Sequence, residues 1–365
     1  MLKIQDIIYE IEAWAPPAIA WDRDNVGLQI GNPEETVTGV LAALEVTRDV
    51  IQEALQKKCN LIITHHPLIF QPLKNLTNKT LSGKLALSIA QNKLNLYSAH
   101  TNLDFTHGGV NFVLGKKLDL QDICFLYQEA GSMKKISVFV PPDYVNAVTD
   151  AMTKAGAGII GDYEACSFQL RGTGTFRPLP GSRPFSGEVG ELQHEDEVRI
   201  EMVSPAWRTN AVVTAMTDAH PYDEVAYDVY PNEAIDPGYG AGVIGSLREE
   251  MSVEDFIAHT KKSINTPAVR WTRGRADSVR RVAICGGSGS ELLQVAIQKK
   301  ADAFVTADVK YHFFHEAHGI IHLIDAGHYE TEHHIVEAIV DRLQKKFQDI
   351  SCYPTRSITN PIIYS

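Results

Sequence analysis

The stretch "NLIITHHPLIF" (residues 60–70) decides how this chain is expected to fold. Its apolar run from Leu61 to Ile63 has the length and branched side chains of a buried strand. The run ends in two adjacent imidazoles, His65 and His66. Ligands of parallel α/β sheets bind outside the carboxyl ends of the strands. We therefore interpret the histidine pair as part of a site at a sheet edge. The competing interpretation is a pair of hydrogen-bonded structural histidines.

Strands alternate with helices on both sides of this stretch. Apolar residues at helical spacing precede it in "RDVIQEALQKKC" (48–59), and "TLSGKLALSIAQNK" (80–93) predicts a second helix. The next predicted strand is "LNLYSA" (94–99), and the same alternation returns after residue 232. This order predicts an α/β fold with a mostly parallel sheet.

The chain contains an internal repeat. "QKKCNLIITHH" (56–66) aligns with "QKKADAFVTAD" (298–308), and the strands before and after each copy also correspond. The ends of the copies agree as well, because an acidic residue follows a histidine by four positions at His100 and again at His328. We interpret the pattern as duplicated βα half-domains that form one metal-binding core, with residues 1–128 as the first half and 233–365 as the second. A chance match is the alternative.

The middle of the chain has a different character. Residues 129–232 predict two successive strand–helix–strand units, which is the order of a ferredoxin-like α+β domain. This segment is therefore expected to be an insert between the two halves of the core. Near the carboxyl end, a single helix is expected from about residue 330 to 347.

Composition narrows the functional classes. The chain of 365 residues has a formal net charge of −11, which disfavours binding to a phosphate backbone. No apolar run approaches the ~18 residues of a membrane span, and the amino-terminal residues do not have the pattern of a signal peptide. The five cysteines are scattered without a CxxC pair. This usage indicates a cytoplasmic protein and argues against a thiolate zinc site.

The chemistry-bearing residues all fall at predicted strand ends. Imidazole and carboxylate donors without cysteine suit zinc above all, or iron or manganese, with positions left open for water. Adjacent histidines at a strand end point to opposite sides, so each could serve one of two ions with a carboxylate bridging them. The candidate residues are His65, His66, His100, Asp104, Asp308, His328 and Glu332.

Four motifs in order give the chain a family resemblance. "WDRDNVGLQIG" (21–31), "IITHHPLIF" (62–70), "AHTNLD" (99–104) and "DAGHYETE" (325–332) resemble the dinuclear-metal, ring-forming family labelled GTP cyclohydrolase I type 2 homologues. The match covers both ends of the chain, and the middle segment is similar to the PII- and CutA-like insert of some members. One departure is Glu45 in "LEVT", where the family often has aspartate, which leaves the role of this residue open.

The resemblance implies specific roles. The metal ligands would be His65, His66, Asp104, His328 and Glu332, with Glu332 bridging two divalent ions. His100 would transfer protons as a catalytic residue. A homohexameric toroid would enclose the sites, and the reaction would be hydrolysis of a small nucleotide-like or phosphorylated substrate. The alternative is a non-catalytic ring protein that senses a metal or ligand; binding to nucleic acid or membrane is not expected.

Overall fold

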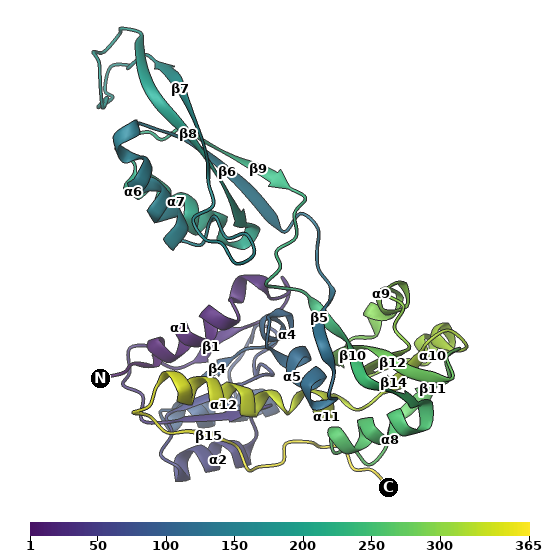
Figure 1. Ribbon diagram of the computed structural model, residues 1–365. Coiled ribbons are helices and arrows are strands. Elements are labelled where there is room, and N and C mark those ends of the chain that lie inside the picture. Colours follow the sequence, from purple (N-terminus) through teal and green to yellow (C-terminus); the bar gives the residue numbers. More distant parts are fainter. The chain divides into compact units, whose positions relative to one another are not determined.

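The computed structural model describes residues 1–365, which form two compact units. The first, here the core unit, comprises Met1–Tyr127 and Gly238–Ser365. The second, here the insert, comprises Gln128–Pro237. The core unit contains two mixed sheets, and the insert contains one antiparallel sheet (Figure 1). None of the helices has the length and apolar composition that a membrane crossing requires.

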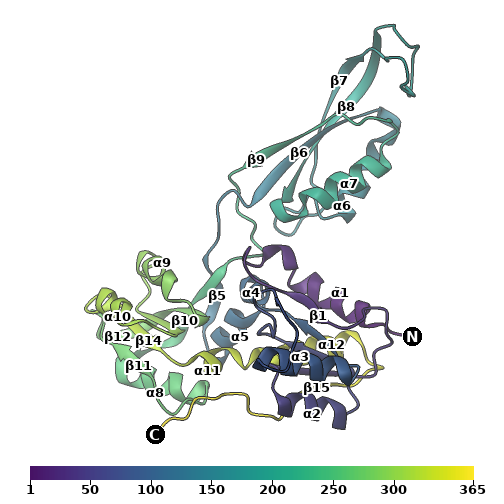
Figure 2. The same ribbon diagram turned by 180° about the vertical axis from the view of Figure 1, so that it is seen from behind.

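The first sheet of the core unit has two covered faces. Leu61 and Ile63 pack against α1 (Ile4–Trp14) and α12 (Ile335–Lys346), which lie side by side in Figure 1. Ile62 points the other way, toward the layer of α2 (Arg48–Gln56) and α3 (Leu81–Gln91) visible in Figure 2. A strand buried on both faces explains the unbroken apolar run. The strand order is β1 (Gly27–Ile30), β4 (Asn95–Ser98), β3 (Leu61–Thr64), β2 (Val40–Ala43), β15 (Cys352–Pro354), all parallel except β1.

The second sheet has the same kind of parallel centre. Helices α5 (Val110–Lys117) and α8 (Val253–Ser263) cover one face, and α9 (Leu293–Gln298) and α10 (Tyr311–Ala317) cover the other. Strands β12, β13 and β14 are parallel, whereas β11, β10 and β5 pair antiparallel at the edges. The order is β11 (Arg270–Thr272), β14 (His322–Asp325), β13 (Ala303–Ala307), β12 (Ser278–Ser288), β10 (Ala241–Ser252), β5 (Gln121–Tyr127).

The helix-to-strand turns before β3 and β13 share an uncommon backbone conformation. Lys58 and Lys300 have φ values of 56° and 58°, in the left-handed region that side chains other than glycine rarely adopt. Each follows a helix that ends two residues earlier, at Gln56 or Gln298. In both turns the residue after the lysine donates its N–H back to the helix, from Cys59 to Ala54 O at 2.9 Å and from Ala301 to Ala296 O at 3.0 Å. These bonds satisfy helix-end carbonyls.

The insert is an antiparallel sheet with two helices. Its apolar residues on alternate strand positions pack beneath α6 (Val145–Lys154) and α7 (Thr209–Ala219). The element order is strand, helix, strand, strand, helix, strand, and the sheet order is β7 (Phe168–Phe176), β8 (Gln193–Pro205), β6 (Met133–Val140), β9 (Tyr227–Asn232). The two terminal strands of the insert pair with each other, because Met133 lies opposite Asn232.

The chain leaves and re-enters the core unit at neighbouring points. Strands β5 and β10 are antiparallel partners, and Tyr127 lies opposite Ala241. The insert therefore occupies the position of a hairpin loop.

The helix expected at about 330–347 is two helices. The first, α11, runs from His328 to Glu332, and α12 begins at Ile335. The break follows from one tightened turn, in which the N–H of Val336 donates to His333 O at 3.2 Å, three residues back. Glu332 is therefore the last residue of its own short helix.

Candidate metal centre

The histidine pair follows β3 directly, and His65 is completely buried. Its Nδ1–H donates to the carbonyl oxygen of Ala99 at 2.8 Å, which leaves Nε2 to face the site. That Nε2 atom makes no hydrogen bond although it is buried. His66 faces differently, and its Nδ1 lies 3.2 Å from Glu45 Oε1. In each histidine a partner of Nδ1 fixes the orientation of the ring, and Nε2 faces the site.

His100 and Asp104 come from the end of the neighbouring strand, β4. His100 caps α4 (Thr101–Phe105), and Asp104 lies on that helix four residues later. The Nδ1–H of His100 donates to Asp24, at 2.9 and 3.0 Å from its two oxygens. Thr101 also donates to Asp24 through its N–H at 3.0 Å and its hydroxyl at 2.5 Å. Burial raises the pKa of Asp24, but these bonds outweigh it and hold that pKa well below its usual range.

His328 and Glu332 approach from the second half of the core unit. They lie four residues apart on α11, so their side chains share one helix face. The Nδ1–H of His328 donates to Asp308 Oδ2 at 2.7 Å. Glu332 is 4% exposed, and its two oxygens face different partners. Oε2 lies 2.8 Å from His66 Nε2 and 3.1 Å from His328 Nε2, whereas Oε1 lies 3.8 Å from His65 Nε2.

These distances fit divalent cations. Two ligands held at ~2.1 Å from one ion can be at most ~4.2 Å apart. His66 Nε2 and His328 Nε2 are 3.3 Å apart, and His65 Nε2 and Asp104 Oδ1 are 3.6 Å apart. Two buried atoms also lack any hydrogen bond: His65 Nε2 and Asp104 Oδ1. Such atoms are costly unless a cation satisfies them. Three donor groups meet the spacing of a metal site: His66–His328–Glu332, His65–Asp104–Glu332 and His65–His66–His100.

The charges of the site are strongly coupled. Burial lowers the pKa of His66, but the Glu332 and Glu45 carboxylates outweigh it and raise the pKa to about 10. The pKa of His328 rises to about 9 because Glu332 and Asp308 likewise outweigh its burial. Burial raises the pKa of Asp104 to about 6. Burial also acts on Glu332, but the facing histidines hold its pKa well below its usual range. Without a cation, protons on His66 and His328 balance the carboxylates.

The structure brings together all six residues that the sequence singled out for metal binding and proton transfer. It also places Asp308 beside His328, where the carboxylate accepts a hydrogen bond from the imidazole instead of facing the donor groups. Two residues whose roles the sequence did not assign are Asp24, which lies in the "WDRDNVGLQIG" motif, and Glu45, which contacts His66 despite its longer side chain. Thr359 donates in turn to Glu45, a contact that nothing in the sequence signals.

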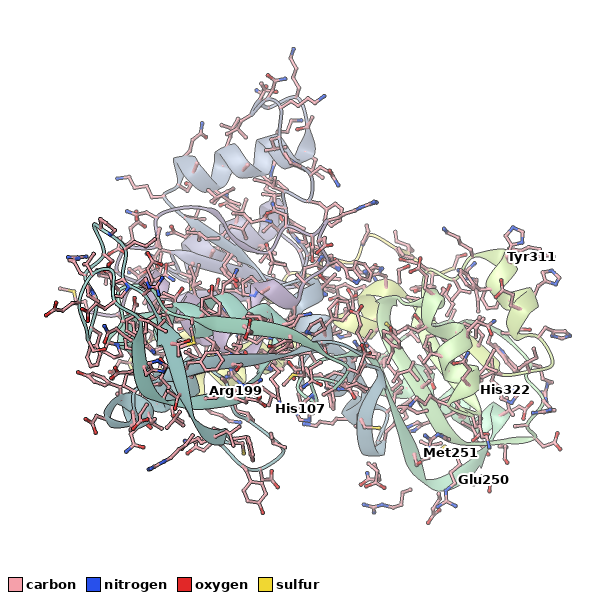
Figure 3. The ribbon with its side chains drawn as sticks, turned by 90° about the horizontal axis from the view of Figure 1, so that it is seen from above. His107, Arg199, Glu250, Met251, Tyr311 and His322 are labelled. Carbon is pink, nitrogen blue, oxygen red and sulfur yellow. The ribbon has the colours of Figure 1, made fainter.

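Other polar groups near the site or in the second half belong to none of these donor groups. The thiol of the partly buried Cys285 has a raised pKa because of its removal from water and the charges of Asp104 and Glu332, so it stays protonated. His322, labelled in Figure 3, is buried on β14 and bonded through both ring nitrogens, to Gly274 N at 3.0 Å and Ala276 O at 2.9 Å. Tyr311, also labelled there, is exposed at the start of α10.

Comparisons with known proteins agree along the whole chain. The model of the family described as Duf34/NIF3 (NGG1p interacting factor 3) matches residues 2–361. A Bacillus subtilis protein named "GTP cyclohydrolase 1 type 2 homolog" is 38% identical over 99% of this chain and 98% of its own. Among solved structures, a Bacillus cereus protein related to NIF3 superposes with a TM-score of 0.83 at 39% identity, covering 100% of this chain and 99% of its own. Staphylococcus aureus protein SA1388 gives 0.78 at 30% identity with the same coverage.

Proposed function

The chain belongs to the Duf34/NIF3 family, and from this premise we propose that it is a dinuclear metal-dependent hydrolase acting on a small nucleotide-like or phosphorylated molecule. The proposal rests on the position of the Glu332 carboxylate. Its two oxygens face separate sets of donors. A carboxylate in that position can bridge two cations. The name of the Bacillus subtilis relative, "GTP cyclohydrolase 1 type 2 homolog", adds hydrolytic ring opening of a guanine nucleotide as the reaction to test first.

Each ion has a donor set in this proposal. One would be held by His65 Nε2, Asp104 Oδ1 and Glu332 Oε1, and the other by His66 Nε2, His328 Nε2 and Glu332 Oε2. Zinc suits nitrogen and oxygen donors of this kind best, and iron or manganese would also be accepted. Asp308 and Glu45 would orient the two histidines of the second set, as hydrogen-bonded carboxylates do at metal sites.

The residues around the ions would perform the remaining chemistry. Bound divalent ions supply a Lewis acid and lower the pKa of water, so that a nucleophile forms near neutral pH. His100 would accept and return a proton through Nε2, because Asp24 occupies its Nδ1. The half-exposed ring of Phe70 meets the His100 ring edge-on at 6.2 Å between centroids and offers an aromatic surface next to the site. This surface supports a substrate with a planar base.

The finer architecture belongs to the proposal as well. The parallel strand–helix–strand units β2–α2–β3 and β12–α9–β13 support duplicated half-domains at residues 1–128 and 233–365. The element order of the insert supports a ferredoxin-like, PII- or CutA-like domain at 129–232. A cytoplasmic homohexameric ring is the assembly that we expect from the family resemblance. Light scattering coupled to gel filtration measures the assembly, and a monomeric mass would overturn the ring.

Metal content is the first experiment. Protein purified without added metal, analysed by inductively coupled plasma mass spectrometry, should contain about two divalent ions per chain. His65→Ala and Glu332→Ala should lose metal. His315→Ala is the matched control, because His315 lies on α10 and belongs to none of the donor groups. Equal metal in wild-type protein and both site variants would refute the centre.

Turnover is the second experiment. The metal-loaded protein is incubated with a library of nucleotides and phosphorylated metabolites, beside Glu332→Gln and chelator-treated protein. Hydrolysis that disappears with the metal and with Glu332→Gln supports the proposal. Hydrolysis that survives metal removal refutes it.

The second candidate function is a non-catalytic, ligand-sensing ring protein. A cavity in the insert favours it, because the core unit has no need of that cavity to bind metal. An intact dinuclear centre without turnover of any library member would favour this alternative.

A further inference from the structure

The insert contains a cavity of about 420 Å³ that no part of the proposed hydrolysis uses. It lies where the segment 178–185 folds back over the ends of β7 and β8 and meets the segment 222–226. The volume is in the range of small-molecule sites. All of its lining residues belong to the insert.

The wall of the cavity is mainly apolar and includes four aromatic rings. The lining includes Phe139, Phe176, Phe185 and Tyr222. The Tyr222 ring contacts two of the others: its centroid lies 6.4 Å from that of Phe176 and 5.5 Å from that of Phe185. Ring faces carry partial negative charge and attract cations.

The charged groups of the cavity are mainly carboxylates. Glu197 is partly buried and accepts a hydrogen bond from the Tyr222 hydroxyl at 3.0 Å through Oε1. Its other oxygen lies against Gly174, where a Cβ atom would be only 2.1 Å from Oε2, so the absence of a side chain there makes room for the carboxylate. The only lysine or arginine in the lining, Arg183, is paired with Asp223 at 3.1 Å. Glu197 and Glu224 therefore keep uncompensated negative charge.

The raised pKa of the Tyr222 phenol agrees with a negative electrostatic potential in the cavity. Burial raises its pKa, and the neighbouring charges of Glu197 and Glu195 raise it further. A negative charge in the cavity is thus opposed, whereas a positive charge would be stabilised.

We propose that this cavity binds a small organic cation, an ammonium group attached to an apolar or aromatic body. The body would fill the aromatic wall, and the ammonium would lie between the ring faces and the Glu197 carboxylate. This is the combination by which aromatic cages select ammonium ligands. The inference is independent of the metal centre and holds whether or not the core unit is an enzyme.

Benzyltrimethylammonium is the probe, with benzyl alcohol and phenylacetate as neutral and anionic counterparts. Binding to the full-length protein is measured by isothermal titration calorimetry and by ligand-observed NMR. The cation should bind at least about 10-fold more tightly than either counterpart. Equal binding of the three probes, or no binding of the cation at 10 mM (about the weakest affinity these methods detect, roughly 3 kcal/mol), would overturn the proposal.

Variants place the probe in the cavity. Glu197→Gln keeps an acceptor for Tyr222 but removes the charge, and Phe185→Leu keeps apolar volume but removes a ring face; each should weaken cation binding about fivefold or more. Glu164→Gln removes the same charge from an exposed position of the insert outside the cavity and should leave binding unchanged. Unchanged affinity in both cavity variants, or equal weakening in Glu164→Gln, would refute the assignment. Circular dichroism verifies that each variant is folded.

Discussion

Gly287 permits the most direct test of the candidate metal centre, because it borders the site without donating to a metal. It lies on β12 with φ +60°, and an added Cβ would be 2.0 Å from Glu332 Oε1 and 3.3 Å from His328 Nε2. Glu332 Oε1 is the end of a flexible side chain, so in Gly287→Ala the carboxylate is expected to move and the fold to survive. The movement separates Glu332 from both donor sets at once.

The expected effect is a large loss of metal affinity with a small loss of stability. Displacing an orienting or ligating group at a metal site typically lowers affinity about 10- to 100-fold. The left-handed backbone adds a cost of about 1–2 kcal/mol to any Gly→Ala change of this kind. Gly319→Ala is the matched control, because Gly319 has φ +72° and open space where the Cβ would be. It carries the backbone cost alone.

The assay compares zinc affinity by chelator competition and unfolding by urea for both variants. Gly287→Ala should lose metal, whereas Gly319→Ala should lose only stability. Wild-type zinc affinity in Gly287→Ala would show that Glu332 does not hold the ions, and the site would have to be reassigned.

Four further outcomes follow from the contacts around the site. Because the pKa values of His66 and His328 rise to about 10 and 9 from 6.5, zinc binding to the metal-free protein at pH 8 should release about two protons from these histidines. Calorimetry in buffers of different ionisation enthalpy counts them, and zero release would contradict the ion pairs. The same raised values stabilise the metal-free fold fully below about pH 6.5, and this contribution is lost as the pH rises through 9 and 10. The melting temperature in chelator should fall over that range; a flat profile would count against the pairing. Asp24→Asn removes charge-assisted bonds to His100 and should cost about 1.5–3 kcal/mol in urea unfolding, whereas a cost near zero would show that Asp24 does not hold His100. Glu45→Gln should lower the pKa of His66 in an NMR titration, and an unchanged value would exclude the contact.

The metal-binding donors could be predicted from the sequence because short-range secondary structure determines their positions. A buried strand that ends in polar side chains delivers His65 and His66 to the sheet edge, and the four-residue spacing on a helix puts His328 beside Glu332. The predicted repeat suggested a relation between the two halves, so residues far apart in the chain could be assigned to one site. The fold is α/β, as expected, but its core has two mixed sheets where one mostly parallel sheet was predicted; the α/β architecture agrees with the related solved structures.

Contacts made by irregular segments could not be anticipated. Asp24 reaches His100 from a segment without helical or strand periodicity, and Thr359 reaches Glu45 from the carboxyl-terminal tail. No pattern in the sequence specifies which carboxylate will meet which partner across such distances. The break before α12 could not be predicted from the sequence either. His333 and His334 keep near-helical angles, and only the hydrogen-bond pattern changes there.

The insertion point has a consequence for folding and for the history of the chain. Tyr127 and Ala241 are paired in the core unit, and Met133 and Asn232 are paired in the insert, so each unit holds its two connections side by side. Closing a flexible loop of this length would cost conformational entropy that grows with the logarithm of its length. An insert whose own fold brings its ends together removes most of that cost. We therefore expect the core unit to fold without this segment when a short turn from β5 to β10 replaces it.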